Sequence, residues 1–181
     1  MHRPIETLRA EHTLANGALD ALAAIGAHVG DHRGFPTADV ALLLRFLRES
    51  VLAVHVRKEA EILWPSIALR ADEATAAVIG ELFRLQAEVQ DLMHSLVLFW
   101  EPVDDLSPAE QDGFAATAAA FVARMRRMQR VEERTLFAVC DAVPADDQLD
   151  WSVRFEEIDA GRVAGAAWQQ RLAPIVGRWT H

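Results

Sequence analysis

Apolar residues recur at helical spacing along nearly the whole chain, and no convincing alternating pattern of β-strands interrupts them. The pattern therefore predicts an all-α protein. Long helices are expected over four segments, which are separated by short stretches: 4–27, 37–64, 72–100 and 107–143. Long helices with short connections are typical of an antiparallel, up-down four-helix bundle.

Local signals mark the ends of these helices. Thr37 is placed to cap the second helix, and Pro65 is expected to stop or kink it, because proline has no amide hydrogen to donate to the preceding turn. The fourth helix begins with the pattern of a capping box that has proline at the first helical position, formed by Ser107, Pro108 and Glu110.

The composition changes after residue 143. Three of the five tryptophans lie in this last part of the chain: Trp151, Trp168 and Trp179. We therefore divide the chain into a bundle at residues 1–143 and a Trp-rich helical extension at residues 144–181, with a fifth helix expected at about 150–171. The tryptophans are expected to pack the extension on the bundle. A homodimer through this segment is the alternative, because aromatic residues are enriched at protein interfaces.

The charge and the single cysteine narrow the range of partners and compartments. The net charge of −9 disfavours binding to nucleic acid or to an anionic membrane. No apolar run approaches the roughly 18 residues of a membrane span, and the N-terminus lacks the apolar segment of a secretory signal. Cys140 has no second cysteine to pair with, which fits a reducing compartment. We expect a cytoplasmic protein without nucleic-acid or membrane partners.

A short frame of residues occurs twice in the chain. It begins at His55 and Glu59, and it recurs at Met128 and Glu132, with 128 − 55 = 73 and 132 − 59 = 73. The second copy keeps the glutamate and has a methionine in place of the histidine. The repeat therefore predicts that the second half of the chain has lost a metal-ligand residue.

The first and third predicted helices also align, with Gln86 at the position of His12 (86 − 12 = 74). The two halves are predicted to be copies of one helix hairpin, related by an approximate twofold axis. In the first half, His12, His55 and Glu59 are expected to face inward, and the last two share a helix face because they lie four positions apart. Their counterparts in the second half are Gln86, Met128 and Glu132.

Several of these motifs resemble those of the haemerythrin-like (HHE cation-binding) proteins. They span about residues 4–140 and comprise the Glu11-His12 pair, His55-xxx-Glu59 with Leu63-Trp64-Pro65, and Glu132 with Leu136-Phe137. The resemblance implies a four-helix bundle that holds two irons, bridged by two carboxylates and an oxygen, with histidines as most of the remaining ligands.

Carried over to this sequence, the resemblance implies that His12 and His55 are terminal ligands of one iron. It implies that Glu59 and Glu132 are the two bridging carboxylates, with Glu133 as a rival for the second. The histidines of the other iron would stand at three positions that hold no histidine here: Gln86, Gln90 and Met128.

Two histidines with one or two carboxylates form the ligand set of a mononuclear non-haem iron site with open positions for oxygen. Our first hypothesis is a protein that binds one iron and uses it for O2, NO or redox chemistry, as a sensor, a carrier or an enzyme. A di-iron oxygen carrier is disfavoured, because oxygen binding as peroxide takes one electron from each of two irons. Two alternatives stay open: a metal-free bundle that acts as an interaction protein, and a bundle that binds haem through a histidine and Met128.

Overall fold

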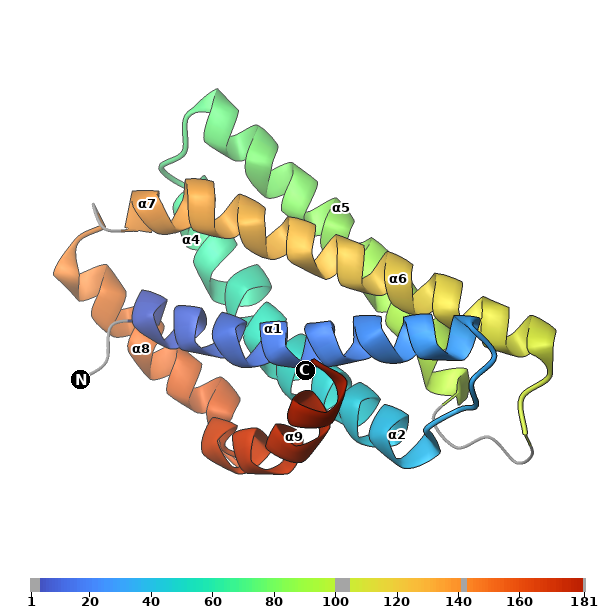
Figure 1. Cartoon of the computed structure of the whole chain (residues 1–181). Helices are drawn as coiled ribbons and strands as arrows, with labels where there is room; N and C mark the ends of the chain where they lie inside the picture. The colour runs from blue at the N-terminus through green and yellow to red at the C-terminus, as the bar shows by residue number, and fades with distance from the viewer. Residues whose placement is uncertain (1–3, 100–104, 141–142, 181) are drawn as a thin grey trace.

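The computed structural model describes residues 4–99, 105–140 and 143–180, and all the regular structure in these ranges is helical (Figure 1). The prediction of an all-α protein is confirmed. The first helix is α1 (Pro4–Gly30). The second long helix changes its winding along its length, through α2 (Thr37–Phe46), the π-helical segment η1 (Leu47–His55), α3 (Val56–Lys58), the π-helical segment η2 (Glu59–Leu63) and α4 (Trp64–Ala68).

The second half has the same plan. Its first helix is α5 (Glu73–Leu96), which ends in a 3-10 turn, η3 (Val97–Phe99). The next long helix runs through α6 (Pro108–Val131), the π-helical segment η4 (Glu132–Leu136) and α7 (Phe137–Cys140). Its predicted capping box is confirmed, because the Ser107 hydroxyl oxygen accepts from the Glu110 amide and the Glu110 carboxylate accepts from the Ser107 amide.

Two predicted helix ends differ from the structure. Thr37 is the first residue of α2 and not its cap, since its hydroxyl donates to the Phe35 carbonyl outside the helix. Pro65 does not stop the second helix, which continues to Ala68. The π-helical turn before Pro65 changes the hydrogen-bond register there, and the Glu61 carbonyl accepts a bond of 3.4 Å from the Arg154 guanidinium.

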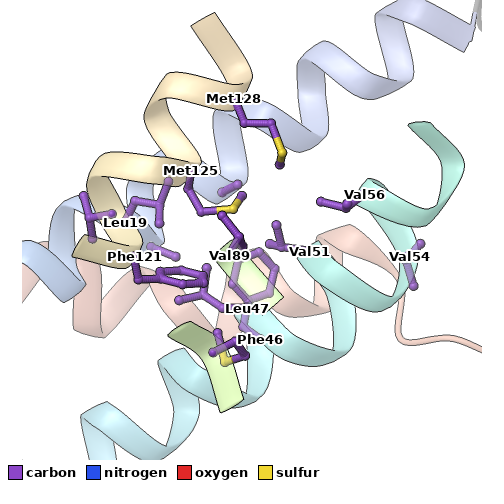
Figure 2. Close-up of a cluster of buried hydrophobic side chains, with 14 of the residues drawn as sticks. Leu19, Phe46, Leu47, Val51, Val54, Val56, Val89, Phe121, Met125 and Met128 are labelled. Carbon is purple, nitrogen blue, oxygen red and sulfur yellow. The ribbon is translucent and has the colours of Figure 1, made fainter. Parts of the chain in front are cut away.

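The helices pack around one apolar interior. α6 lies beside both α1 and α5, and α1 also contacts the second long helix at η1 (Figure 1). Figure 2 shows part of this interior, where Val51 of η1 and Val89 of α5 lie near Phe121, Met125 and Met128 of α6. This packing closes the middle of the bundle to water around a few buried polar side chains.

The extension contains two helices rather than the single helix expected at about 150–171. These are α8 (Ala145–Asp159) and α9 (Gly165–Trp179). The turn between them contains Gly161, whose φ of +74° is a left-handed conformation that glycine adopts without a steric penalty. Both helices contact α1, so α1 lies between α6 and the extension (Figure 1).

The tryptophans of the extension contact the rest of the chain. Trp151 and Trp168 are buried, and Trp168 packs edge-on against Phe46 at 5.4 Å between ring centroids. The Trp179 indole donates to the Asp39 carboxylate at 2.8 Å. These three indoles therefore make contacts within the chain.

Two surface properties bear on the predicted partners. Arg124, Arg126 and Arg127 on α6 each form an ion pair with an acidic side chain of α5 or α1, which is typical of a solvated helix face. Within the described ranges, no helix has both the length and the apolar character that crossing a bilayer requires.

Candidate metal centre

Four polar side chains meet in the apolar interior. His12 comes from the first third of α1, His55 ends η1, Glu59 begins η2 and Glu132 begins η4. All four are at most 3% exposed. The structure therefore brings together the four residues that the sequence singles out, and three of them stand at the boundaries of π-helical turns.

The inner atoms of these side chains face one another at short range. One ligand atom each from His12, His55 and Glu59 lies within 4.8 Å of the other two. The Nε2 atom of His55 is 3.4 Å from a Glu59 oxygen. The Nε2 atom of His12 lies 3.6 Å from the other Glu59 oxygen and 3.4 Å from a Glu132 oxygen. Glu132 thus reaches the group from the side of His12.

These inner atoms lack hydrogen-bond partners. The unpartnered atoms are Nε2 of both histidines and both carboxylate oxygens of Glu59 and of Glu132, counted among the residues that the structure describes. Burying such atoms without a partner costs roughly 1–3 kcal/mol each, and more for a charged group. A divalent cation accepts electron pairs from imidazole nitrogens and carboxylate oxygens, so this donor set fits a metal ion.

The outer nitrogen of each histidine is bound to a carboxylate. The Nδ1 atom of His55 lies 2.8 Å from Glu11, and that of His12 lies 3.0 Å from Glu133. A carboxylate only accepts, so each Nδ1 carries the hydrogen and each Nε2 presents its lone pair to the interior when the ring is neutral. Metal-binding histidines usually have such an outer partner, which sets the ring orientation.

Glu133 therefore does not compete with Glu132 for the interior. Its side chain is half-exposed and contacts the outer side of His12, whereas Glu132 is fully buried. The ring of Phe137 stacks on His12 at 5.4 Å between centroids and holds the imidazole from another side. From the sequence, Glu11 stands out only as the neighbour of His12. The contact of Glu11 with His55 depends on how α1 and η1 pack.

The electrostatics of the site call for a positive charge at its middle. Burial and the charge of Glu132 raise the pKa of Glu59 to about 7. Burial also raises the pKa of Glu132. Burial by itself lowers the pKa of His12, but the two neighbouring carboxylates of Glu132 and Glu59 favour its protonated form, outweigh the burial and raise that pKa to about 10. In the absence of a metal, a proton on His12 thus supplies the cation that two buried carboxylates require.

The second half of the bundle offers no comparable group in the part of the chain that the structure describes. The six buried side chains of α5 are all apolar: Ile79, Leu82, Leu85, Val89, Met93 and Leu96. Gln86 is only partly buried and Gln90 is exposed, so neither amide lies in the interior, where a second iron would need its ligands. The buried counterpart of His12 is Leu85, with 85 − 12 = 73, the same offset as in the second and fourth helices.

Met128 occupies the remaining position of the second half. It is fully buried, and Figure 2 shows its side chain in the apolar cluster with Met125 and Val56. Leu85 and Met128 therefore give the second half buried apolar side chains at the positions where the first half has two imidazoles.

A cavity of about 310 Å³ lies between the bundle and the extension. Glu11 and His55 line it on the bundle side, and Asp159 at the end of α8 and Arg162 in the turn after it line the other side. Apolar side chains, including Phe46 and Val51, form much of the rest of its wall. A small molecule in this cavity would lie against the Glu11–His55 pair.

Residues 3–140 match the family described as Hemerythrin HHE cation binding domain. Comparisons with curated proteins and with solved structures gave no match. The matched range covers the helices that carry all four interior polar residues and leaves out the extension. The chain belongs to the hemerythrin HHE cation-binding family.

Proposed function

We propose that the protein is a cytoplasmic, haemerythrin-like metal protein that holds one divalent ion, iron, inside an antiparallel four-helix bundle. His12, His55 and Glu59 would bind the ion, and Glu132 would complete the set. The observation that carries this proposal is the set of buried nitrogen and oxygen atoms that face one another without hydrogen-bond partners.

One ion is favoured over two by the asymmetry of the interior. All the buried side chains of α5 are apolar, and Met128 stands where the repeat would put a histidine. A thioether is a soft ligand that does not replace imidazole for Fe(II). The proposed centre therefore has imidazole ligands on one side only.

An iron bound there would supply a redox-active centre for chemistry with O2 or NO. The surrounding residues have separate tasks in this proposal. Glu11 and Glu133 orient the two imidazoles, and the apolar side chains around Met128 exclude water from the interior. The protein would serve as a sensor, a carrier or an oxidase-like enzyme.

Metal analysis of protein purified without a polyhistidine tag tests this proposal. We expect about one iron per chain in the wild type and a loss of bound iron in His55→Leu. His94→Leu is the matched control, since His94 is exposed on α5 and should bind as the wild type does. Two tightly held irons per chain, or none after reconstitution with Fe(II), would contradict the proposal.

The unpartnered interior atoms also separate this function from that of a metal-free interaction protein. Without an ion, His55→Leu would remove an unsatisfied polar atom and leave the protein as stable or more stable. With an ion, the same change abolishes the gain in melting temperature that Fe(II) gives the wild type. Thermal unfolding with and without Fe(II) under anaerobic conditions distinguishes the two.

A further inference from the structure

We propose that Lys58 and Asp159 are positioning residues of the metal centre, so that the C-terminal extension forms part of its outer support. This inference rests on the proposed function. It concerns a row of four side chains that starts at His55 in the bundle, passes through Glu11 and Lys58, and ends at Asp159 in α8.

Lys58 is the middle of this row. It is fully buried, which is rare for lysine, and its ammonium group lies 2.6 Å from Glu11 and 2.8 Å from Asp159. The ammonium also lies 5.6 Å from the centre of the Phe155 ring. A buried cation needs close anionic partners to offset its lost hydration. One of its two carboxylates belongs to the bundle and the other to the extension.

Glu11 carries the effect of Lys58 to the metal ligand. One of its oxygens accepts from Lys58, and the other accepts from the Nδ1–H of His55 at 2.8 Å. With both oxygens bound, the carboxylate is held in one orientation although the cavity beside it leaves room for others. Lys58 therefore keeps Glu11 against His55, and Glu11 keeps the His55 Nε2 atom directed at Glu59.

Asp159 holds Lys58 from the other side. It is the last residue of α8, a helix anchored by the buried side chains of Trp151, Phe155 and Ile158. The Asp159 side chain is 48% exposed, so it pairs with Lys58 from the edge of the core and is not itself buried. Without Asp159, Lys58 would keep a single carboxylate partner in a buried place, and its hold on Glu11 would change.

The test measures binding of Co(II) to the full chain by competition with a coloured chelator, together with the visible spectrum of the bound Co(II). We expect Lys58→Met to raise the Kd about tenfold and to shift the spectrum, because outer partners of metal-binding histidines typically contribute 10–100-fold. Asp159→Asn, one step further out, should raise the Kd about threefold. The double variant should match Lys58→Met, since Asp159 acts through Lys58.

Asp147→Asn is the matched control. It makes the same change on the same helix, but Asp147 pairs with Arg70 at 2.7 Å at the other end of α8 and not with Lys58. It should leave the Kd and the spectrum unchanged. Circular dichroism of the metal-free variants shows whether each is folded during the assay, and Asp159→Asn carries the test if Lys58→Met is not.

The inference fails if Asp159→Asn binds Co(II) with the wild-type Kd and spectrum, or if Asp147→Asn weakens binding as much. A wild-type chain that binds neither Co(II) nor Fe(II) overturns the proposed function itself. The two failures are therefore distinguishable.

Discussion

In each of the two interior histidines, the two ring nitrogens face different surroundings. Nδ1 donates to a carboxylate near the surface, and Nε2 faces the buried carboxylates of Glu59 and Glu132. Imidazole is suited to this because one ring offers a donor and an acceptor on opposite sides. Loss of an inner carboxylate (Glu59 or Glu132) should therefore affect the site differently from loss of an outer one (Glu11 or Glu133).

Loss of an outer carboxylate should weaken metal binding without abolishing it. Glu133→Gln replaces the partner of His12 by a neutral amide, and we expect the Kd for Fe(II) or Co(II) to rise about tenfold. Competition titration measures the change. Glu88→Gln, which removes an exposed carboxylate paired with Arg124, should have no effect. An unchanged Kd in Glu133→Gln would mean that Phe137 alone suffices to hold the ring.

The metal-free protein should become less stable as the pH rises. The pKa of His12 is raised to about 10, so its contribution to the free energy of unfolding is fully present below about 6.5 and is lost as the pH rises through 10. The raised pKa of Glu59, about 7, acts in the same direction between about pH 4.5 and 7, because the charged form is disfavoured.

Urea unfolding in the presence of a chelator, from pH 6 to pH 9.5, measures this dependence. We expect the free energy of unfolding to fall over the range, and His12→Gln to flatten the part above pH 7. A wild-type stability that is constant or rises with pH in this range would show that the two buried carboxylates do not hold a proton at His12.

Element-scale features decide where the side chains point. His55, Glu59 and Glu132 all stand at the boundaries of π-helical turns, and such turns often mark functional sites. A π-helical turn accommodates an extra residue and rotates the next residues about the helix axis. Helical periodicity alone does not reveal these turns, because the spacing of apolar residues around a single extra residue still resembles that of an α-helix.

The register of α5 makes a prediction about the second half of the bundle. Leu85 and Met128 are the buried counterparts of His12 and His55. The double variant Leu85→His/Met128→His should therefore raise the metal content from about one ion per chain toward two. It should also destabilise the metal-free protein, because two buried imidazoles replace apolar side chains.

Metal analysis and thermal unfolding of this double variant check both effects. Gln86→His/Gln90→His is its control, because these positions are partly or fully exposed on α5 and should leave the content near one. A second ion in the control variant, together with no second ion in the Leu85→His/Met128→His variant, would show that the register assigned to α5 is wrong.

At the scale of the whole molecule, the extension and the bundle share buried surface. Trp168 of α9 is 2% exposed and contacts Phe46 of α2, and Asp39 of α2 binds both Arg178 and Trp179. The hydrophobic contact and the polar contacts both join α9 to α2. The division of the chain into two parts at residue 143 therefore stays a prediction from the sequence.

Removal of the Trp168 side chain should destabilise the whole chain. Trp168→Ala should lower the free energy of unfolding by about 3–5 kcal/mol, because it leaves a large cavity at a buried site. Val153→Ala on the exposed face of α8 is the control, with an expected change within about 0.5 kcal/mol. Urea unfolding followed by circular dichroism measures both. A small loss in Trp168→Ala would indicate that the extension is only loosely attached.

Short-range periodicity by itself determined much of this protein. The helical class, the approximate helix ranges and the shared face of His55 and Glu59 come from neighbours along one helix, where 3.6 residues complete each turn. The recurrence at an offset of 73 likewise singled out Glu132. These features depend on residues close together in sequence or on copies of the same pattern.

The tertiary structure alone decided which distant side chains meet. Glu11 and Lys58 lie 47 positions apart, and Asp159 comes from beyond the bundle. Lysine is almost always exposed, so no pattern in the sequence marks Lys58 as a buried partner. The inward position of Leu85 also depends on packing between elements. Such contacts arise only when separate helices exclude water together, which helical periodicity does not encode.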